Sequence, residues 1–165
     1  ALAAPAERLR AMKGMSDGAV ALLKAVEAAA IRLARKQVHR KPVLSSWSAL
    51  LDYCKTAIAR APVEQFRLLL LDRKNRLIED AVMAEGTVDH TPVYPREIVK
   101  RALEAGASAI ILVHNHPSGD PAPSRADIEM TKAIAAAAKP LGVAIHDHLV
   151  IGRTGHASFR ELGLL

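Results

Sequence analysis

The sequence is poor in the residues that hold small secreted domains together or cross membranes. Cys54 is the single cysteine among 165 residues, so neither an internal disulfide nor a cysteine-based zinc site can form. One unpaired cysteine is typical of a reducing compartment, and we expect a cytoplasmic protein. No apolar run approaches the roughly 18 residues that a membrane span requires, so we expect no membrane partner. Aromatic residues make up only 3% of the chain, so its core must consist of Leu, Ile, Val and Ala.

The N-terminal third differs from the rest of the chain in its charge and in how it begins. It lacks an initiator methionine and the basic-then-apolar order of a signal peptide, so we expect a fragment of a longer chain. Residues 1–60 contain 11 Lys and Arg against 4 Asp and Glu, a net charge of +7, whereas the remainder is close to neutral. This asymmetry predicts either contact with DNA or another polyanion, or a well-solvated helix surface.

Apolar periodicity divides the chain into a helical part and a mixed part. Residues 1–44 indicate helices, the longest over 19–37, with one apolar stripe formed by Leu22, Leu23, Val26, Ala29, Ala30 and Leu33. Residues 45–165 begin with a helix capped by Ser45 or Ser46. They continue with a strand hairpin over 64–86, further strands at 108–116 and 143–152, helices at 95–106 and 125–139, and a short tail. The expected fold is α/β (α+β): a mixed β-sheet flanked by helices, with a small helical N-terminal appendage.

Two histidines lie one residue apart at the end of a predicted strand. Because side chains alternate along a strand, His114 and His116 project from one face and can deliver two nitrogens to a metal ion. Asp127 is the candidate third ligand, since it lies in the first turn of the following helix with Ser124 at the N-cap. Two histidines and one aspartate leave a fourth tetrahedral position for water, as in catalytic zinc sites. The same stretch also fits a polar turn followed by an ordinary capping box.

The whole stretch matches a metalloprotease signature. The order His114-x-His116-Pro117, six residues, and then Ser124-x-x-Asp127 resembles the motif of the JAMM/MPN+ (JAB) metalloproteases without a gap. The strings TPVYPREIVKRALEAGASAIILV, HNHPSGDPAPSRADIEMT and DHLVIG are similar to the RadC-type (UPF0758) branch of that superfamily, and the resemblance covers residues 60–165 densely. It implies a JAB/MPN domain with a cytidine-deaminase-like fold, in a family linked to DNA repair.

The resemblance also implies roles for the residues of the motif. His114, His116 and Asp127 would bind Zn²⁺, and Ser124 would support the oxyanion of a tetrahedral intermediate. The implied activity is zinc-dependent hydrolysis of a peptide or isopeptide bond. The substrate is a peptide or protein whose identity the resemblance does not specify.

The catalytic glutamate of the family lies on an early strand and moves protons between water and the leaving amine. Glu64, at the start of the first predicted strand, matches that position best. Glu97 and Glu85 are rivals. Glu97, however, suits a helix N-terminus, where a negative charge is favourable, and Glu85 suits a turn.

A second histidine pair lies on the last long strand. His146 and His148 are also one residue apart, so we expect them to share a face, which is compatible with a second metal site. The interpretation that we favour is that Asp147 and His148 are structural, bonding to a ligand imidazole or to the loop of the site.

The N-terminal region resembles part of a helix-hairpin-helix, which RadC-type proteins carry ahead of the JAB domain. Gly14 matches the first glycine of the hairpin, but Ser16 replaces the second. DNA binding and a purely structural helical appendage therefore both stay open. A metal-dependent nuclease is a further alternative, although only Asp127 and Asp120 are near the histidines and two-metal sites need more carboxylates. A non-catalytic DNA-binding or repair accessory protein is another.

Overall fold

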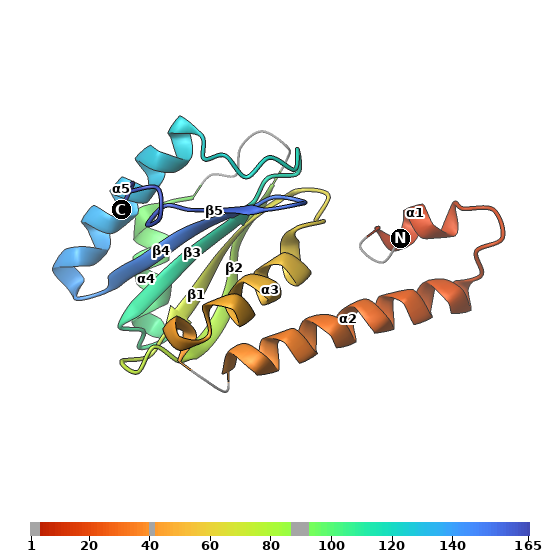
Figure 1. Ribbon diagram of the computed structural model, residues 1–165, viewed down its shortest axis with the longest axis horizontal. Coiled ribbons are helices and arrows are strands. Elements are labelled where there is room, and N and C mark those ends of the chain that lie inside the picture. The colour runs from red at the N-terminus through yellow and green to blue at the C-terminus, as the bar shows by residue number, and fades with distance from the viewer. Residues whose placement is uncertain (1–3, 40–41, 87–92) are drawn as a thin grey trace.

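The computed structural model describes residues 4–39, 42–86 and 93–165, and this part combines helices with a five-stranded sheet (Figure 1). The α-helices are α1 (Ala6–Arg10), α2 (Asp17–His39), α3 (Trp47–Ile58), α4 (Pro95–Glu104) and α5 (Arg125–Ala138). Two 3-10 turns are η1 (Val43–Ser45) and η2 (Lys139–Leu141). The strands are β1 (Glu64–Leu71), β2 (Leu77–Gly86), β3 (Ala109–Asn115), β4 (Ala144–Ile151) and β5 (His156–Ser158).

The sheet is mixed, as predicted, with the strand order β2-β1-β3-β4-β5. β3 and β4 run parallel, whereas the other neighbouring pairs are antiparallel, including the predicted hairpin of β1 and β2. The expected tail is wrong in one respect, because residues 156–158 form β5 and pair with the end of β4. Since β3 and β4 are parallel, the segments that follow them emerge at the same edge of the sheet.

Apolar layers cover both faces of the sheet. One lies under α3 and includes Leu69, Leu71, Ile111 and Val113. The other lies under α4 and α5 and includes Leu68, Leu70, Ile110 and Leu112 (Figure 1). Strands covered on both faces are apolar throughout instead of alternating, which explains the four consecutive leucines of β1. The helices thus hold β1 and β3 rigidly at the centre of the domain.

Helix α2 is confirmed, but its apolar stripe is not the face that packs. Leu22, Val26 and Leu33 of the apolar stripe are exposed by 65%, 47% and 65%. The helix instead turns Ile31 and Ala34 toward the core beneath α3. Alanines occur on every side of this helix, so apolar periodicity alone did not identify the face that packs.

The junction between the two predicted domains is a short turn. The boundary expected at residues 44 and 45 falls inside η1, and the division into a 1–44 part and a 45–165 part stays a prediction. Ser46 stands at the N-cap of α3, yet no side-chain cap forms there. Its hydroxyl contacts the carbonyl oxygen of Pro42 at 3.1 Å, and that of Ser45 contacts the same oxygen at 2.8 Å. The expected serine cap is therefore wrong.

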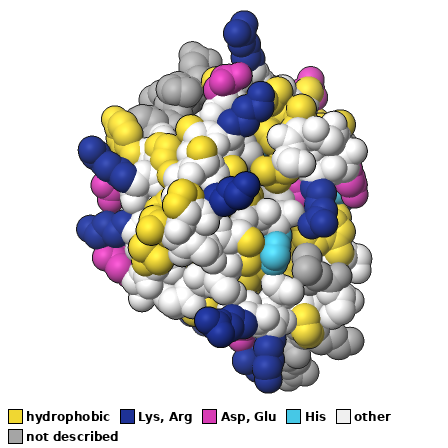
Figure 2. All heavy atoms as spheres, turned by 90° about the vertical axis from the view of Figure 1, so that its left-hand side faces the viewer, with side chains coloured by type: hydrophobic (Ala, Val, Ile, Leu, Met, Phe, Trp, Pro, Cys, Tyr) yellow, Lys and Arg dark blue, Asp and Glu magenta, His cyan; other side chains and the backbone are white. Residues whose placement is uncertain are grey.

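The surface mixes apolar and charged side chains. On the face that Figure 2 shows, Lys and Arg are spread among apolar and acidic side chains and do not gather in one place. In the part of the chain that the structure describes, no helix combines the length and apolar character needed to cross a bilayer.

Candidate metal centre

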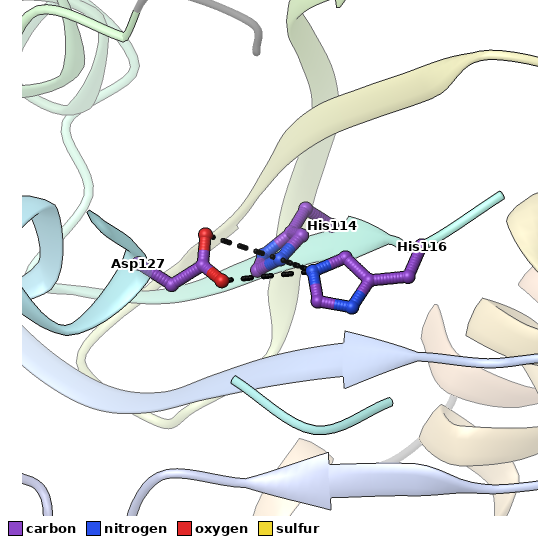
Figure 3. Close-up of side chains that lie close together, drawn as sticks. All are labelled: His114, His116 and Asp127. Carbon is purple, nitrogen blue, oxygen red and sulfur yellow. Dashed lines mark hydrogen bonds and ion pairs between the residues drawn. The ribbon is translucent and has the colours of Figure 1, made fainter. Parts of the chain in front are cut away.

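The end of β3 and the start of α5 bring three candidate ligands together (Figure 3). His114 is fully buried near the end of β3, and His116 follows the strand directly. Their Nε2 atoms lie 3.0 Å apart. Asp127 places Oδ1 at 3.4 Å from Nε2 of His114 and Oδ2 at 3.6 Å from Nε2 of His116. These side chains form a group that can hold a metal ion.

The spacing of these atoms fits a tetrahedral ion. Ligands at zinc distances and tetrahedral angles lie about 3.3 Å from one another. The separations of 3.0, 3.4 and 3.6 Å fall on either side of that value. Two imidazoles with one carboxylate are also a donor set that suits Zn²⁺ and leaves its fourth position open. The residues present therefore fit zinc.

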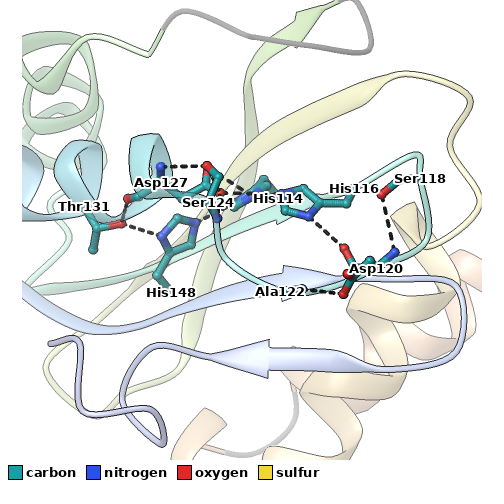
Figure 4. A network of polar contacts seen from close by, with 9 residues as sticks. All are labelled: His114, His116, Ser118, Asp120, Ala122, Ser124, Asp127, Thr131 and His148. Carbon is teal, nitrogen blue, oxygen red and sulfur yellow. Dashed lines mark hydrogen bonds and ion pairs between the residues drawn. The ribbon is translucent and has the colours of Figure 1, made fainter.

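Hydrogen bonds behind His114 determine which of its nitrogens faces the centre (Figure 4). The Thr131 hydroxyl donates its only hydrogen to the carbonyl oxygen of Asp127 at 2.6 Å, so it must accept a hydrogen from Nδ1 of His148, also at 2.6 Å. Burial lowers the pKa of His148 well below its usual value, so this ring is neutral. Nε2 of His148 then accepts from Nδ1 of His114 at 2.7 Å. His114 consequently turns an unprotonated Nε2 toward the centre, as metal ligation requires.

The loop after β3 orients His116 in the same way. Its Nδ1 donates to the carbonyl oxygen of Asp120 at 2.8 Å, which leaves Nε2 unprotonated toward the centre. Gly119 has a φ of 98°, which favours glycine. A Cβ on Gly152, in the turn after β4, would lie 2.4 Å from the carbonyl oxygen of Gly119. Glycine at position 152 thus lets the turn after β4 pack closely against the loop that holds His116.

A capping box fixes Asp127 at the start of α5, as predicted. Oγ of Ser124 accepts from the backbone N–H of Asp127 at 3.1 Å, and the Asp127 carboxylate accepts from the backbone N–H of Ser124 at 2.7 Å. The Ser124 hydroxyl also donates to this carboxylate at 2.6 Å. Burial alone would raise the pKa of Asp127, but the neighbouring imidazoles of His114 and His116 hold it well below its usual range. The Asp127 carboxylate in turn raises the pKa of His116, so a metal ion would compete with a proton for its Nε2.

Glu64 lies at the start of β1, the strand that neighbours β3 and its candidate ligand histidines. β1 pairs with β3 so that Phe66 stands opposite His114, and Glu64 comes two residues before Phe66 on β1. Directly opposed residues project from the same face of a sheet, and so do residues two apart on one strand, which sets Glu64 on the face of His114. The charge of Glu64 contributes to the raised pKa of His116. The structure therefore brings Glu64 beside the ligand group, while its catalytic role stays a prediction.

Asn115 is a residue of the site that the sequence analysis missed. It is fully buried between the two ligand histidines. Its Oδ1 accepts from the backbone N–H of Gln65 at 2.9 Å, and its Nδ2 donates to the carbonyl oxygen of Val63 at 3.1 Å. These bonds hold the backbone on both sides of Glu64. A buried amide needs such partners. The presence of Asn115 inside an otherwise apolar strand was therefore the sequence signal that could have identified it.

The rival carboxylates lie elsewhere. Glu97 is exposed in the first turn of α4 and pairs with Arg96 at 3.3 Å. Glu85 was expected in a turn, but it lies within β2. There it stands opposite Gln65, and its carboxylate accepts a hydrogen bond from the Gln65 side chain at 3.2 Å. Glu85 thus shares the face of Gln65, which is the face opposite to that of Glu64.

The prediction that His146 and His148 share one face is wrong. A bulge in β4 leaves His146 without a partner in β3, because Ile110 pairs with Ile145 and Ile111 with Asp147. Regular alternation is lost there. Nε2 of His146 lies 2.7 Å from Oδ1 of Asn75 in the β1–β2 turn, whereas His148 faces α5. The expected contact between His148 and a ligand imidazole is confirmed.

Comparisons with known proteins agree with this geometry. The family model described as a RadC-like JAB domain matches residues 44–164. A UPF0758 protein from Rhodobacter capsulatus is 65% identical over 164 residues, which cover 99% of this chain and 77% of that protein. Another UPF0758 protein, from Ruegeria pomeroyi, is 57% identical over 99% of this chain and 73% of its own length. With the fold, the histidine and aspartate group and these matches in agreement, the chain belongs to the RadC family of JAB-domain proteins.

Proposed function

We propose that this protein is a zinc-dependent hydrolase of the JAMM type that cleaves a peptide or isopeptide bond. The observation that carries the proposal is the convergence of His114, His116 and Asp127 with two unprotonated imidazole nitrogens turned inward. Zinc held by these residues would polarise a carbonyl group and make water nucleophilic near neutral pH.

Two further side chains supply the proton transfer and the polar support that such a reaction needs. Glu64, held by Asn115 on both sides, is the base that takes a proton from water and passes it to the leaving amine. The Ser124 hydroxyl donates to the ligand Asp127 in this structure. Rotation about its Cα–Cβ bond would let the hydroxyl donate to a developing oxyanion instead, which stabilises the transition state more than the bound substrate.

The test combines metal analysis with a fluorescence-quenched peptide library. The purified chain should contain about one zinc per molecule. Glu64→Gln should keep the zinc and lower turnover by at least about 100-fold, because general-base catalysis typically contributes that much. His114→Ala should lose both zinc and turnover. Glu85→Gln is the matched control and should behave as the unmodified chain. Full turnover in Glu64→Gln would contradict the assignment of the base, and a chain that binds no zinc would contradict the reaction.

DNA is the second partner that we propose, through the basic N-terminal third. In the hairpin-like turn Gly14 has a φ of 85°, and Oγ of Ser16 accepts from the backbone N–H of Ala19 at 3.2 Å. Ser16 therefore serves as a helix cap where the resembled motif has glycine. The whole chain should retard DNA in an electrophoretic mobility shift assay, and the retardation should decrease as salt is added. Arg8→Gln/Lys13→Gln should weaken this binding, and unchanged binding by the variant would contradict the contact.

A nuclease receives less support. The Asp120 carboxylate accepts from the backbone N–H of Ala122 at 2.9 Å, and it is not part of the group that can hold a metal. In the described part of the chain this leaves one carboxylate, that of Asp127, among the ligands, whereas two-metal phosphodiester chemistry needs several.

A further inference from the structure

A basic pocket lies between α2, the end of α3 and the turn that follows β4. Its volume is about 360 Å³, and it is lined by Glu27, Ala30, Lys55, Thr56, Ala59, Arg60, Arg153 and Thr154. Of the four charged side chains that the described residues contribute, three are cations: Lys55 lies in the last turn of α3, Arg60 follows that helix, and Arg153 comes from the distant turn after β4. Two alanines and two threonines complete the wall. The pocket is separate from the zinc ligands and belongs to no part of the proposed reaction.

The positive charge of this pocket is not neutralised from within. Among the described residues that line it, the one carboxylate is that of Glu27, which forms an ion pair with Lys24 at 2.7 Å. No carboxylate of the described residues lies within ion-pairing distance of Lys55, Arg60 or Arg153. Arg153 uses Nη2 to donate to the carbonyl oxygen of Pro117 at 2.8 Å, and its other guanidinium N–H groups make no bond among the described residues. The three cations thus have no carboxylate partner among the described residues.

We propose that this pocket binds a phosphate group. Three cations match a phosphate dianion better than a singly charged carboxylate, and a guanidinium presents paired N–H donors that fit two phosphate oxygens. None of the described residues that line the pocket is aromatic, so a nucleobase finds no ring of theirs to stack on and the phosphate itself is the recognised group. The contrast with the scattered cations on the face in Figure 2 shows that the clustering is local.

The pocket adjoins the metal centre through two of its cations. Arg153 bonds to Pro117, the residue after the ligand His116. Arg60 precedes Glu64 by four residues, a span of at most about 14 Å along the chain. A phosphate bound there would therefore lie near the loop that follows His116, since Arg153 contacts both the pocket and that loop.

Calorimetry on the whole chain tests the proposal with sodium phosphate as the probe and sodium acetate as the comparison, at constant ionic strength. Phosphate should bind the unmodified chain, and Lys55→Gln/Arg60→Gln should weaken it at least about tenfold, since each lost charge-assisted bond is strong. Arg73→Gln/Lys74→Gln, in the exposed β1–β2 turn, removes the same charge and should bind phosphate as the unmodified chain does. Circular dichroism confirms that both variants fold.

The same titrations distinguish the alternatives. If the Lys55→Gln/Arg60→Gln variant binds phosphate with unchanged affinity, for example because zinc holds the phosphate, the proposal is overturned. It is also overturned if acetate binds the unmodified chain as tightly as phosphate does. An absence of phosphate binding overturns it too. Oligothymidylate that displaces phosphate from the unmodified chain identifies a nucleic-acid backbone as the source. If oligothymidylate does not displace bound phosphate, the pocket takes a free or terminal phosphate.

Discussion

The molecule contains two histidine pairs with the same spacing at neighbouring parallel strands, and among the described residues only one of them belongs to a group that can hold a metal ion. At the end of β3, the side chains of His114 and His116 converge with Asp127. On β4, His146 and His148 separate: His146 contacts Asn75, and His148 contacts Thr131 and His114. The two pairs therefore have different surroundings despite an identical local pattern.

The difference comes from the backbone and from what each strand faces. The pairing of β3 with β1 is regular up to His114, so side-chain alternation places its histidines on one side. The bulge in β4 inserts His146 as an extra residue and moves it away from His148. His148 then lies behind His114 and orients it. An i, i+2 pair thus indicates a metal site only where the strand is regular and a third ligand faces it.

Removing one histidine from each pair should produce the largest contrast. His116→Ala takes away a ligand and leaves two, so bound zinc should fall from about one per chain to less than about 0.1. His146→Ala should retain full zinc because its side chain faces the β1–β2 turn. Zinc analysis after dialysis, with circular dichroism as the folding control, measures both. Equal zinc loss in the two variants would show that both pairs bind metal.

Asp147, the residue between the second pair, should have the largest effect on stability. It is buried, and its carboxylate accepts from the backbone N–H of His148 at 2.7 Å, from that of Arg160 at 3.0 Å and from the Ser158 hydroxyl at 2.5 Å. Asp147→Ala leaves these donors unpaired and should lower the free energy of unfolding by roughly 3 kcal/mol. Urea unfolding measures it. Asp52→Ala, at an exposed position on α3, is the control. A similar decrease in its free energy of unfolding would contradict a particular contribution of Asp147.

His148 should influence zinc affinity without being a ligand. His148→Leu removes the acceptor for Nδ1 of His114, so the ring loses its fixed orientation and zinc should bind about 10- to 100-fold more weakly. His148→Gln offers an amide oxygen as acceptor and should recover part of the affinity. Competition with a chelating dye measures the dissociation constants. Complete loss of zinc in both variants would make His148 a ligand, and unchanged affinity would make it a filler of the core.

Much of the fold could be predicted because local signals and packing agree. The leucine run of β1, the proline at the start of α4 and the capping box of α5 each favour one structure, and the core confirms it. The ligand group followed from the spacing of His114, His116 and Asp127, since a strand end and a helix start are rigid.

The remaining features depend on long-range contacts. The bulge at His146 arises where β4 meets β3, and nothing in its own sequence marks it. The buried face of α2 is selected by its contact with α3, since its leucines and alanines cover more than one side. Asn115 acts on the backbone around Glu64, some fifty residues earlier, which no local pattern reveals.

The smallest expected effect concerns the pH dependence of His146. Burial, and then the nearby positive charge of Arg160, lower the pKa of His146 below its usual value. The unfolded chain therefore binds a proton at this ring before the folded chain does, and the stability of the protein should decrease as the pH falls below about 6.5. Because the ring is partly exposed, solvent screens the effect to a few tenths of a kcal/mol.

Urea unfolding at pH 7.5 and pH 5.5 measures how far the free energy of unfolding falls with pH, and the decrease should be smaller in His146→Gln than in the unmodified chain. Asn75→Ala, which removes the hydrogen bond but keeps the ring, should retain the full decrease, and an identical decrease in all three proteins would assign the pH dependence to other groups.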